Sequence, residues 1–362
     1  MDEQVLLAQR HGGVSRYVVA LVQALRADPG LGVDVDLWAA FSANEHAGAA
    51  GLTRTLPGLA GDAATTLAGL AAYHAANTAA RSSRRRAAVV HATWYHPRFL
   101  PALRRGAPLV TTVHDMTPEL APEQFPQRSP SLAKAAYVAA SSVVLTVSQR
   151  SADDLVAVYG PPPGPVIVTP LAPAPVFSPR ATPPPGAPGR YLLAVGARGG
   201  YKDFPTALDT LAALDRGVML VAVGGGPLTQ EERTAVHRRG LDGRVRAVRA
   251  DDPELAAWYS HAVALLVTSR HEGFGLPTLE AMACGCPVVA ADTSVHPEVG
   301  GPAADYAPAG DAGAFAAAVA RLLDDHDHRA RRRSAGLARA ASFSWARTAA
   351  ATAQGYRVAL RS

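Results

Sequence analysis

Two glutamates, Glu272 and Glu280, bracket a glycine-containing segment that has the features of an anion-binding site. Gly273 and Gly275 let the backbone approach a ligand closely. Pro277 suits the first position of a helix, whose free amides and dipole attract an anion such as a diphosphate. Both glutamates can then face one crevice. Taken singly, each has a simpler interpretation, because Glu280 can complement the helix dipole and Glu272 can be a solvated loop charge.

Two cations follow a strand-like segment in the second half of the chain. Arg198 and Lys202 come soon after the apolar run 191–195. Positive charge at such a place stabilises the negative charge that develops on a leaving diphosphate. Lys202 is informative because Lys134 is the only other lysine among 35 basic residues. The sequence therefore favours a phosphate-binding role for Lys202.

Two weaker features lie in the first half of the chain. Gly12 and Gly13 precede a helix-like segment, a pattern that is often only a turn. His114 follows the strand-like segment 109–113, where a histidine is usually a packed or capped loop residue. Neither feature predicts a function by itself.

The segment EGFGLPTLEAMACGCPVV at 272–289 closely resembles the signature of retaining glycosyltransferase family 4, which includes mannosyltransferase-like group 1 glycosyltransferases. The resemblance implies that Glu272 contacts the transferred sugar and that Glu280 binds the ribose. It also implies that the residues between them hold the sugar and phosphates of a nucleotide-sugar donor: Gly273, Phe274, Gly275, Leu276 and Thr278.

The resemblance extends from residue 12 to about residue 360. It implies further roles: Gly12 and Gly13 at the donor diphosphate, Arg198 and Lys202 as its cationic clamp, and His114 at the sugar. Tyr201 stands where many members have arginine. The catalytic candidates are therefore His114, Arg198, Lys202 and Glu272.

Apolar strand-like segments alternate with helix-like segments along the chain, which predicts parallel sheets covered on both faces. Helices are expected at 13–27, 315–323 and 344–360. A short strand is expected within 1–8, because a Rossmann half normally opens with one, and a start codon upstream of Met1 is left open. The other strands are expected at 33–37, 88–91, 109–113, 143–147, 166–169, 191–195, 218–223, 245–248, 263–267 and 287–290.

The resemblance implies the GT-B architecture, in which two Rossmann-like, doubly wound parallel-sheet domains face each other across a cleft. The first, 1–172, should bind the acceptor, and the second, 190–342, the nucleotide sugar. Twelve prolines between Pro161 and Pro188 mark the boundary, since each removes a hydrogen-bond donor and fixes φ. We expect a linker at 173–189 and a terminal helix, within 343–362, that returns to the first domain.

The composition excludes several classes of protein. Hydrophobic residues make up 48% of the chain and charged residues 18%, which suits a soluble α/β protein. The net charge of +5 comes with no nucleic-acid-binding module, so no nucleic-acid partner is expected. The basic runs 81–86 and 329–333 are interpreted as solvated faces, with peripheral contact to an anionic membrane as the alternative. No apolar run is long enough to span a membrane.

Cys284 and Cys286 are the only two cysteines, which excludes a disulfide scaffold. We interpret them as packed thiols in a reducing cytoplasm.

No cofactor and no metal is expected. Asp34 and Asp36 match an Asp-x-Asp metal motif, but they alternate with apolar residues and should face solvent from one strand. The Asp/His run 324–328 is interpreted as a solvated connection between helices. Arg198, Lys202 and a helix N-terminus would supply the positive potential that a metal otherwise provides.

The resemblance implies transfer of a hexose from GDP-mannose or UDP-hexose, with retention, to a hydroxyl of a glycan, lipid-linked or small-molecule acceptor. Two alternatives stay open: a sugar-nucleotide epimerase or phosphorylase of the same fold, and a non-catalytic sugar-nucleotide-binding subunit. The spacing of the two glutamates argues against the first. The presence of Glu272, Glu280, Lys202 and His114 argues against the second.

Overall fold

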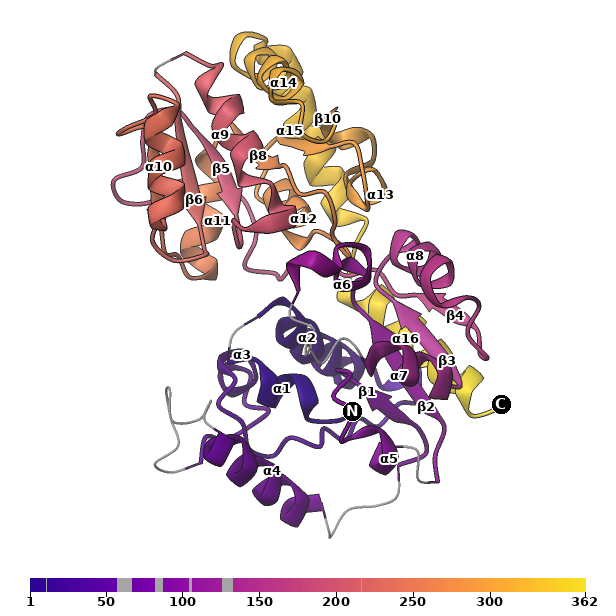
Figure 1. Ribbon diagram of the computed structural model, residues 1–362. Coiled ribbons are helices and arrows are strands. Elements are labelled where there is room, and N and C mark those ends of the chain that lie inside the picture. The colour runs from indigo at the N-terminus through magenta and orange to yellow at the C-terminus, as the bar shows by residue number, and fades with distance from the viewer. Residues whose placement is uncertain (11, 57–66, 82–86, 104–105, 126–132, 216) are drawn as a thin grey trace. The chain divides into compact units, whose positions relative to one another are not determined.

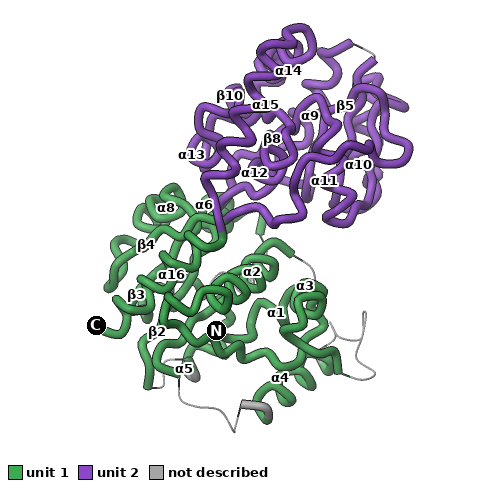
Figure 2. Tube along the Cα trace, turned by 180° about the vertical axis from the view of Figure 1, so that it is seen from behind, with its two compact units in different colours: residues 1–171, 345–362 green, residues 172–344 purple. Residues whose placement is uncertain are grey.

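The computed structural model describes residues 1–10, 12–56, 67–81, 87–103, 106–125, 133–215 and 217–362 (Figure 1). They form two compact units. Unit 1 consists of Met1–Leu171 together with Trp345–Ser362, and unit 2 of Ala172–Ser344 (Figure 2). His11 and most of the basic run 81–86 lie outside the described residues.

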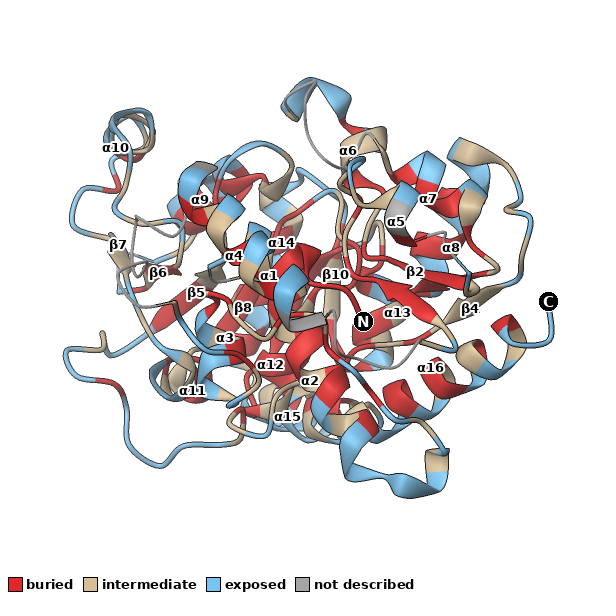
Figure 3. Ribbon diagram, turned by 90° about the horizontal axis from the view of Figure 1, so that it is seen from below, coloured by how far each residue is buried: buried red, intermediate tan, exposed pale blue. Residues whose placement is uncertain are grey.

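Unit 1 is built on a four-stranded parallel sheet whose strands follow one another in chain order. The first three strands are buried along their whole length, which is typical of parallel strands covered on both faces. Figure 3 shows β2 in the red of buried residues. The strands are β1 (Val90–Ala92), β2 (Leu109–Val113), β3 (Val143–Thr146) and β4 (Val166–Val168).

Helices α7 (Lys134–Ala140), α8 (Gln149–Tyr159) and α16 (Trp345–Ala359) contact this sheet. Helix α2 (Gly13–Ala27) packs against α16, which contacts β2, β3 and β4. Gly355 permits this close packing, because a Cβ there would lie 2.9 Å from Cδ2 of Leu145 on β3. The remaining helices are α1 (Gln4–Ala8), α3 (Glu45–Ala49), α4 (Leu67–Arg81), α5 (Leu100–Leu103) and α6 (Thr117–Leu120), with 3-10 turns at Pro29–Leu31 and Pro122–Gln124.

Unit 2 contains a six-stranded parallel sheet in the order β10-β9-β8-β5-β6-β7. The first strand of the unit, β5, pairs with β6 on one side and with β8 on the other. The chain therefore changes direction across the sheet at β5, and open α/β sheets bind ligands at the carboxyl ends of strands at such a switch point. The strands are β5 (Tyr191–Val195), β6 (Met219–Val223), β7 (Val245–Val248), β8 (Ala264–Val267), β9 (Val288–Ala291) and β10 (Asp305–Ala307).

Helices lie between these strands along the chain, and a core of apolar side chains from both joins them. Leu192, Leu220 and Leu266 from the strands pack with Leu208 and Phe315 from the helices. The helices are α9 (Phe204–Ala212), α10 (Gln230–Arg238), α11 (Asp252–His261), α12 (Leu276–Ala283), α13 (His296–Gly300), α14 (Ala312–Asp324) and α15 (His326–Ala341), with 3-10 turns at Gly200–Lys202 and Gly301–Ala303.

Most of the predicted strands are confirmed. Those expected at 109–113, 191–195 and 245–248 have the same bounds as β2, β5 and β7, and six others differ by one or two residues. The short strand β10 was not predicted from the sequence.

Two predicted strands are wrong. The segment 1–8 forms helix α1 after Met1 and Asp2, whose backbones bond to Trp38 and His91. The segment 33–37 forms no strand in the described structure, although Asp34 and Asp36 are exposed and Val35 and Leu37 are buried as expected. The alternation of apolar and polar residues therefore predicted correctly which side chains are exposed, but it wrongly predicted that the segment pairs with a neighbouring strand.

The proline-rich segment expected as a linker belongs to unit 2. The Arg180 amide donates to Ser260 Oγ at 2.9 Å, and Phe177 is buried with its ring 6.1 Å from that of Tyr259. These contacts hold the segment on helix α11.

The Asp/His run 324–328 is not a solvated connection throughout. His328 is buried in the first turn of α15, with Nε2 2.9 Å from Asp305 Oδ2 on β10. In the adjoining basic run, Arg332 pairs with Asp305 at 2.6 Å. Part of the positive charge of 329–333 is therefore paired inside unit 2.

Cys284 and Cys286 are free, buried thiols, as predicted. Burial raises the pKa of Cys284 to about 12 and also raises the pKa of Cys286. Neither thiol is ionised at neutral pH, so both act as packing groups.

Candidate active site

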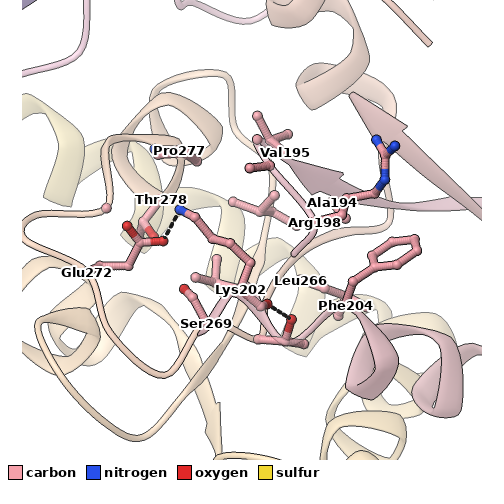
Figure 4. Close-up of a pocket in the computed structure, with 16 residues that line it drawn as sticks. Ala194, Val195, Arg198, Lys202, Phe204, Leu266, Ser269, Glu272, Pro277 and Thr278 are labelled. Carbon is pink, nitrogen blue, oxygen red and sulfur yellow. Dashed lines mark hydrogen bonds and ion pairs between the residues drawn. The ribbon is translucent and has the colours of Figure 1, made fainter. Parts of the chain in front are cut away.

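A pocket in unit 2 lies where strands β5 and β8 end, at the switch point of the sheet. Its walls come from the loop that follows β5, the loop that follows β8 and the first turn of α12. Arg198, Lys202, Glu272, Gly275 and Thr278 line it (Figure 4). The structure thus brings together in one place residues from two separate sequence motifs.

Lys202 and Glu272 form an ion pair in this pocket, with 2.6 Å between Nζ and Oε1 (Figure 4). Each side chain is about one-fifth exposed, at 21% and 18%, so a ligand can reach both groups. Thr268 Oγ1 donates to the Lys202 carbonyl at 2.9 Å and joins the two loops. The pocket therefore presents a cation and a carboxylate side by side.

Ser294 fixes the backbone that carries Glu272. Its hydroxyl accepts from the Glu272 amide at 3.1 Å and donates to the Glu272 carbonyl at 3.2 Å. Ser294 has φ of 56°, in the region that L-residues rarely adopt, and such strain persists only where surrounding contacts impose it. This residue follows β9, and no feature of the sequence had pointed to it.

The guanidinium of Arg198 is bound by other groups of unit 2. This buried group donates to both carboxylate oxygens of Glu232, at 2.9 and 3.1 Å, and to the carbonyls of Gly224, Gly225, Gly226 and Pro227. Figure 4 shows it pointing away from the Lys202–Glu272 pair. Arg198 therefore shapes the glycine turn after β6, and Glu232 offsets its charge.

Glu232 is held ionised for this task. Burial raises the pKa of its carboxyl group, but hydrogen bonds from Arg198 and the Thr229 amide outweigh that effect and lower it overall. Thr229 and Glu232 also form a capping box at the start of α10. That Thr-x-x-Glu spacing is a helix-start signal that the sequence does contain.

Glu280 lies one turn into α12 and is buried, at 4% exposure. The hydroxyl of Tyr259, on α11, donates to its Oε2 at 3.2 Å. Glu280 is not among the described residues that line the pocket. The two glutamates of the motif therefore differ, since Glu272 is open to a ligand and Glu280 is enclosed.

The N-terminus of α12 lies beside the pocket, which Gly275, Pro277 and Thr278 line. Gly275 caps the helix with φ of 77°, a left-handed conformation that favours glycine. The helix has no side-chain cap, and Pro277 lies in its first turn. The preceding Phe274 is buried, with its ring 6.0 Å from that of Phe343. Packing of Phe274 fixes the backbone conformation at the start of α12. A helix N-terminus in this position can bind an anion.

In unit 1, His114 follows the end of β2 and is buried. Its amide donates to the Tyr95 hydroxyl at 3.1 Å, and its ring meets the Tyr17 ring edge-on, with 5.0 Å between centroids. Burial, with a smaller effect of Lys134, lowers the pKa of His114 to about 3. The imidazole is therefore neutral at pH 7, and its buried Nε2 has no hydrogen-bond partner among the described residues.

The glycine loop of unit 1 is shaped by Gln9. The Ser15 amide donates to Gln9 Oε1 at 3.1 Å, and a Cβ on Gly12 would lie 2.5 Å from the same oxygen. Gly13 starts helix α2 with open space at its Cβ position. Tyr17 on α2 reaches Thr112 on β2 at 3.2 Å and so links this loop to the strand that carries His114.

Lys134 is a buried residue that supports the loop after His114. Its ammonium donates to the Asp115 carbonyl at 2.7 Å and pairs with Glu119 at 2.8 Å. Tyr159 donates to the other oxygen of Glu119 at 2.7 Å. The only sequence feature that could have pointed to Lys134 is that lysine is rare in this chain. Both lysines, Lys134 and Lys202, form ion pairs with glutamates.

The described residues contain no group of three or more His, Cys, Asp or Glu side chains able to hold a metal ion. None of the helices in the described part of the chain has the length and hydropathy needed to cross a membrane.

Two parallel-sheet α/β units, with a charged pocket at a switch point, define a GT-B protein. The chain matches solved structures of this fold over nearly its whole length. Sucrose-phosphate synthase from Thermosynechococcus elongatus has a TM-score of 0.72 at 24% identity, covering 96% of this chain and 93% of that one. Anabaena Alr3699/HepE, solved in complex with UDP and glucose, has a TM-score of 0.71 at 21% identity and 95% coverage of each chain.

The chain belongs to the group 1 glycosyltransferases. The model of Glycosyl transferases group 1 matches residues 183–339, and that of Glycosyltransferase Family 4 matches 11–172. A D-inositol 3-phosphate glycosyltransferase from Xylanimonas cellulosilytica is 31% identical over 293 residues, 73% of this chain and 69% of that protein. O-antigen chain mannosyltransferase B from Escherichia coli is 29% identical over 267 residues, 69% and 70% of the two chains. A Thermobispora bispora relative, 34% identical, is matched over 66% of its length.

Proposed function

We propose that the protein is a retaining, metal-independent hexosyltransferase that uses a nucleotide-diphosphate sugar. The observation that supports this most directly is the accessible Lys202–Glu272 pair beside the N-terminus of α12. A cation and helix amides suit a diphosphate, and a carboxylate suits sugar hydroxyls and the positive charge of an oxocarbenium-like transition state. One pocket would thus accommodate both parts of such a donor.

Donor binding would separate the ion pair. Lys202 would turn to the diphosphate, and Glu272 would be released to the sugar. The bond from the anomeric carbon to the phosphate oxygen would break as a bond to the acceptor oxygen forms on the same face. The acceptor proton would pass to a phosphate oxygen of the donor. Neutral His114 would offer the sugar a hydrogen bond without exchanging a proton.

The donor is proposed to be GDP-mannose or UDP-hexose. The Escherichia coli relative is a mannosyltransferase, and the HepE structure contains UDP and glucose. The acceptor would be a hydroxyl of a glycan, a lipid-linked sugar or a small molecule. The buried free thiols suit a reducing compartment, and we propose the cytoplasm.

The test is turnover of each donor by the purified full chain, with release of nucleoside diphosphate followed chromatographically. An α-linked donor should give an α-linked product, which the one-bond C1–H1 coupling constant in NMR reports. A β-linked product would contradict retention. Tight binding of the donor with neither transfer nor hydrolysis would instead identify a non-catalytic sugar-nucleotide-binding protein.

A further inference from the structure

Two buried polar atoms beside Gly275 have no hydrogen-bond partner among the described residues: Oγ1 of Thr278 and Nδ1 of His296. A Cβ on Gly275 would lie 3.7 Å from the first atom and 3.8 Å from the second. Because glycine has no Cβ, this position stays open. Gly275 and Thr278 both line the pocket that contains Lys202 and Glu272.

The hydrogen bond that His296 makes through Nε2 decides whether its Nδ1 donates or accepts. Its Nε2 lies 3.0 Å from the carbonyl oxygen of Ser269, which can only accept a hydrogen bond, and 3.3 Å from the Ser269 hydroxyl, which can donate or accept. The shorter contact, to the carbonyl, favours the tautomer with the proton on Nε2, in which Nδ1 is an acceptor. Burial lowers the pKa of His296, so the ring remains neutral near pH 7. Thr278 adds a hydroxyl that can donate as well as accept.

A ligand group must satisfy both atoms. A hydroxyl can donate to Nδ1 of His296 and accept from the Thr278 hydroxyl at the same time. An ionised phosphate oxygen or a base carbonyl has no proton to donate, so it would leave Nδ1 unsatisfied. The donor offers hydroxyls on its sugar and on its ribose, and the pocket beside Gly275 is the one that Glu272 lines.

We propose that His296 and Thr278 bind one hydroxyl of the transferred sugar and that they determine which sugar the enzyme accepts. This inference rests on the proposed function. It assigns a role to His296, which lies outside every sequence motif considered above. A site built around a substrate hydroxyl discriminates against analogues that lack it, because the buried polar atoms are then left unpaired.

The test compares dissociation constants for the preferred nucleotide sugar and for its nucleoside diphosphate, measured by calorimetry. Thr278→Val keeps the shape and removes the hydroxyl, and His296→Leu removes the acceptor. Both should weaken nucleotide-sugar binding about tenfold and leave nucleoside diphosphate binding within about twofold. His296→Asn, which restores an acceptor near the position of Nδ1, should recover part of the loss.

A control is Thr210→Val in the same unit, where the threonine is buried and its hydroxyl donates to the Thr206 carbonyl at 2.8 Å. It should change neither dissociation constant. A series of monodeoxy sugar nucleotides extends the test. One analogue should bind wild type about tenfold more weakly than the parent sugar, yet bind Thr278→Val as well as it binds wild type.

Equal weakening of both ligands would overturn the inference, because the pair would then act on the diphosphate or ribose. Unchanged binding of both would overturn it as well, since the two atoms would then be satisfied by water. If His296→Leu fails to fold, Thr278→Val and the deoxy series decide. Failure of the proposed function is distinguishable, because wild type would then either bind neither ligand or bind the nucleotide sugar without turning it over.

Discussion

At the scale of single residues, Lys202 and Glu272 occupy one ion pair but should have separable roles. Glu272→Gln keeps the size of the side chain and removes its charge, so turnover should fall more than nucleoside diphosphate affinity. Lys202→Met should mainly weaken nucleoside diphosphate binding, by ~1.5–3 kcal/mol for a lost charge-assisted hydrogen bond. Steady-state kinetics and calorimetry measure the two effects. Normal turnover with poor diphosphate binding in Glu272→Gln would show that its role has been misassigned.

The buried pair of Glu280 and Tyr259 allows a test of whether Glu280 binds the ribose or has only a structural role. Glu280→Gln should weaken nucleoside diphosphate binding by ~1.5–3 kcal/mol if the carboxylate binds ribose. Tyr259→Phe removes only the hydroxyl that orients the carboxylate, so its effect should be smaller. Unchanged calorimetric affinity in Glu280→Gln, together with a lower midpoint of unfolding, would restrict Glu280 to a structural role.

Two buried histidines should make the stability of unit 1 depend on pH. Burial lowers the pKa of both His91 and His114 to about 3, below the value of ~6.5 in an unfolded chain. Between these values the unfolded chain binds more protons, so the free energy of unfolding rises with pH and falls on acidification. From pH 7.5 to pH 5 each histidine should remove about 2 kcal/mol.

Urea denaturation at the two pH values checks this prediction. His114→Asn cannot titrate in this range and should lose the contribution of one histidine to the pH dependence. An unchanged pH dependence in that variant would mean that His114 is not the titrating group.

At the scale of elements, the loop between β2 and α6 is held by the buried Lys134–Glu119 pair. Removing one partner of a buried pair leaves an uncompensated charge, so Lys134→Met should destabilise unit 1 by ~3–5 kcal/mol. The double variant Lys134→Met with Glu119→Gln should recover part of that loss. Denaturant unfolding of wild type, Lys134→Met, Glu119→Gln and the double variant measures the coupling energy. A double variant no more stable than Lys134→Met would show that the two residues act independently.

At the scale of the whole molecule, two units with separate sheets and cores predict that a ligand of unit 2 stabilises that unit first. Nucleoside diphosphate at about 100 times its dissociation constant should add ~2.7 kcal/mol to its stability. Because Lys202 and the amides of α12 would hold the diphosphate, the effect should persist after dialysis against EDTA. Differential scanning calorimetry with and without EDTA tests this. A stabilisation that returns only with Mn²⁺ or Mg²⁺ would contradict metal-independent binding.

The sequence by itself determined the features that depend on local pattern. Apolar runs such as 109–113 and 191–195 predicted β2 and β5 with the same bounds, because a buried parallel strand is continuous and apolar. The glycine and proline of the α12 start, and a lysine in an arginine-rich chain, indicated where an anion could bind. Each of these signals is contained within a few consecutive residues.

Only the tertiary structure decided which groups meet. Lys202 and Glu272 are 70 residues apart, and the pairing of β5 with β8 brings them to one pocket. The same folding pairs Arg198 with Glu232 and encloses Glu280 with Tyr259. Ser294 and His296 follow β9 and carry no motif, so only sheet order places them beside β8. Hydrogen-bond partners distant in sequence are chosen by strand order and packing, which no local pattern encodes.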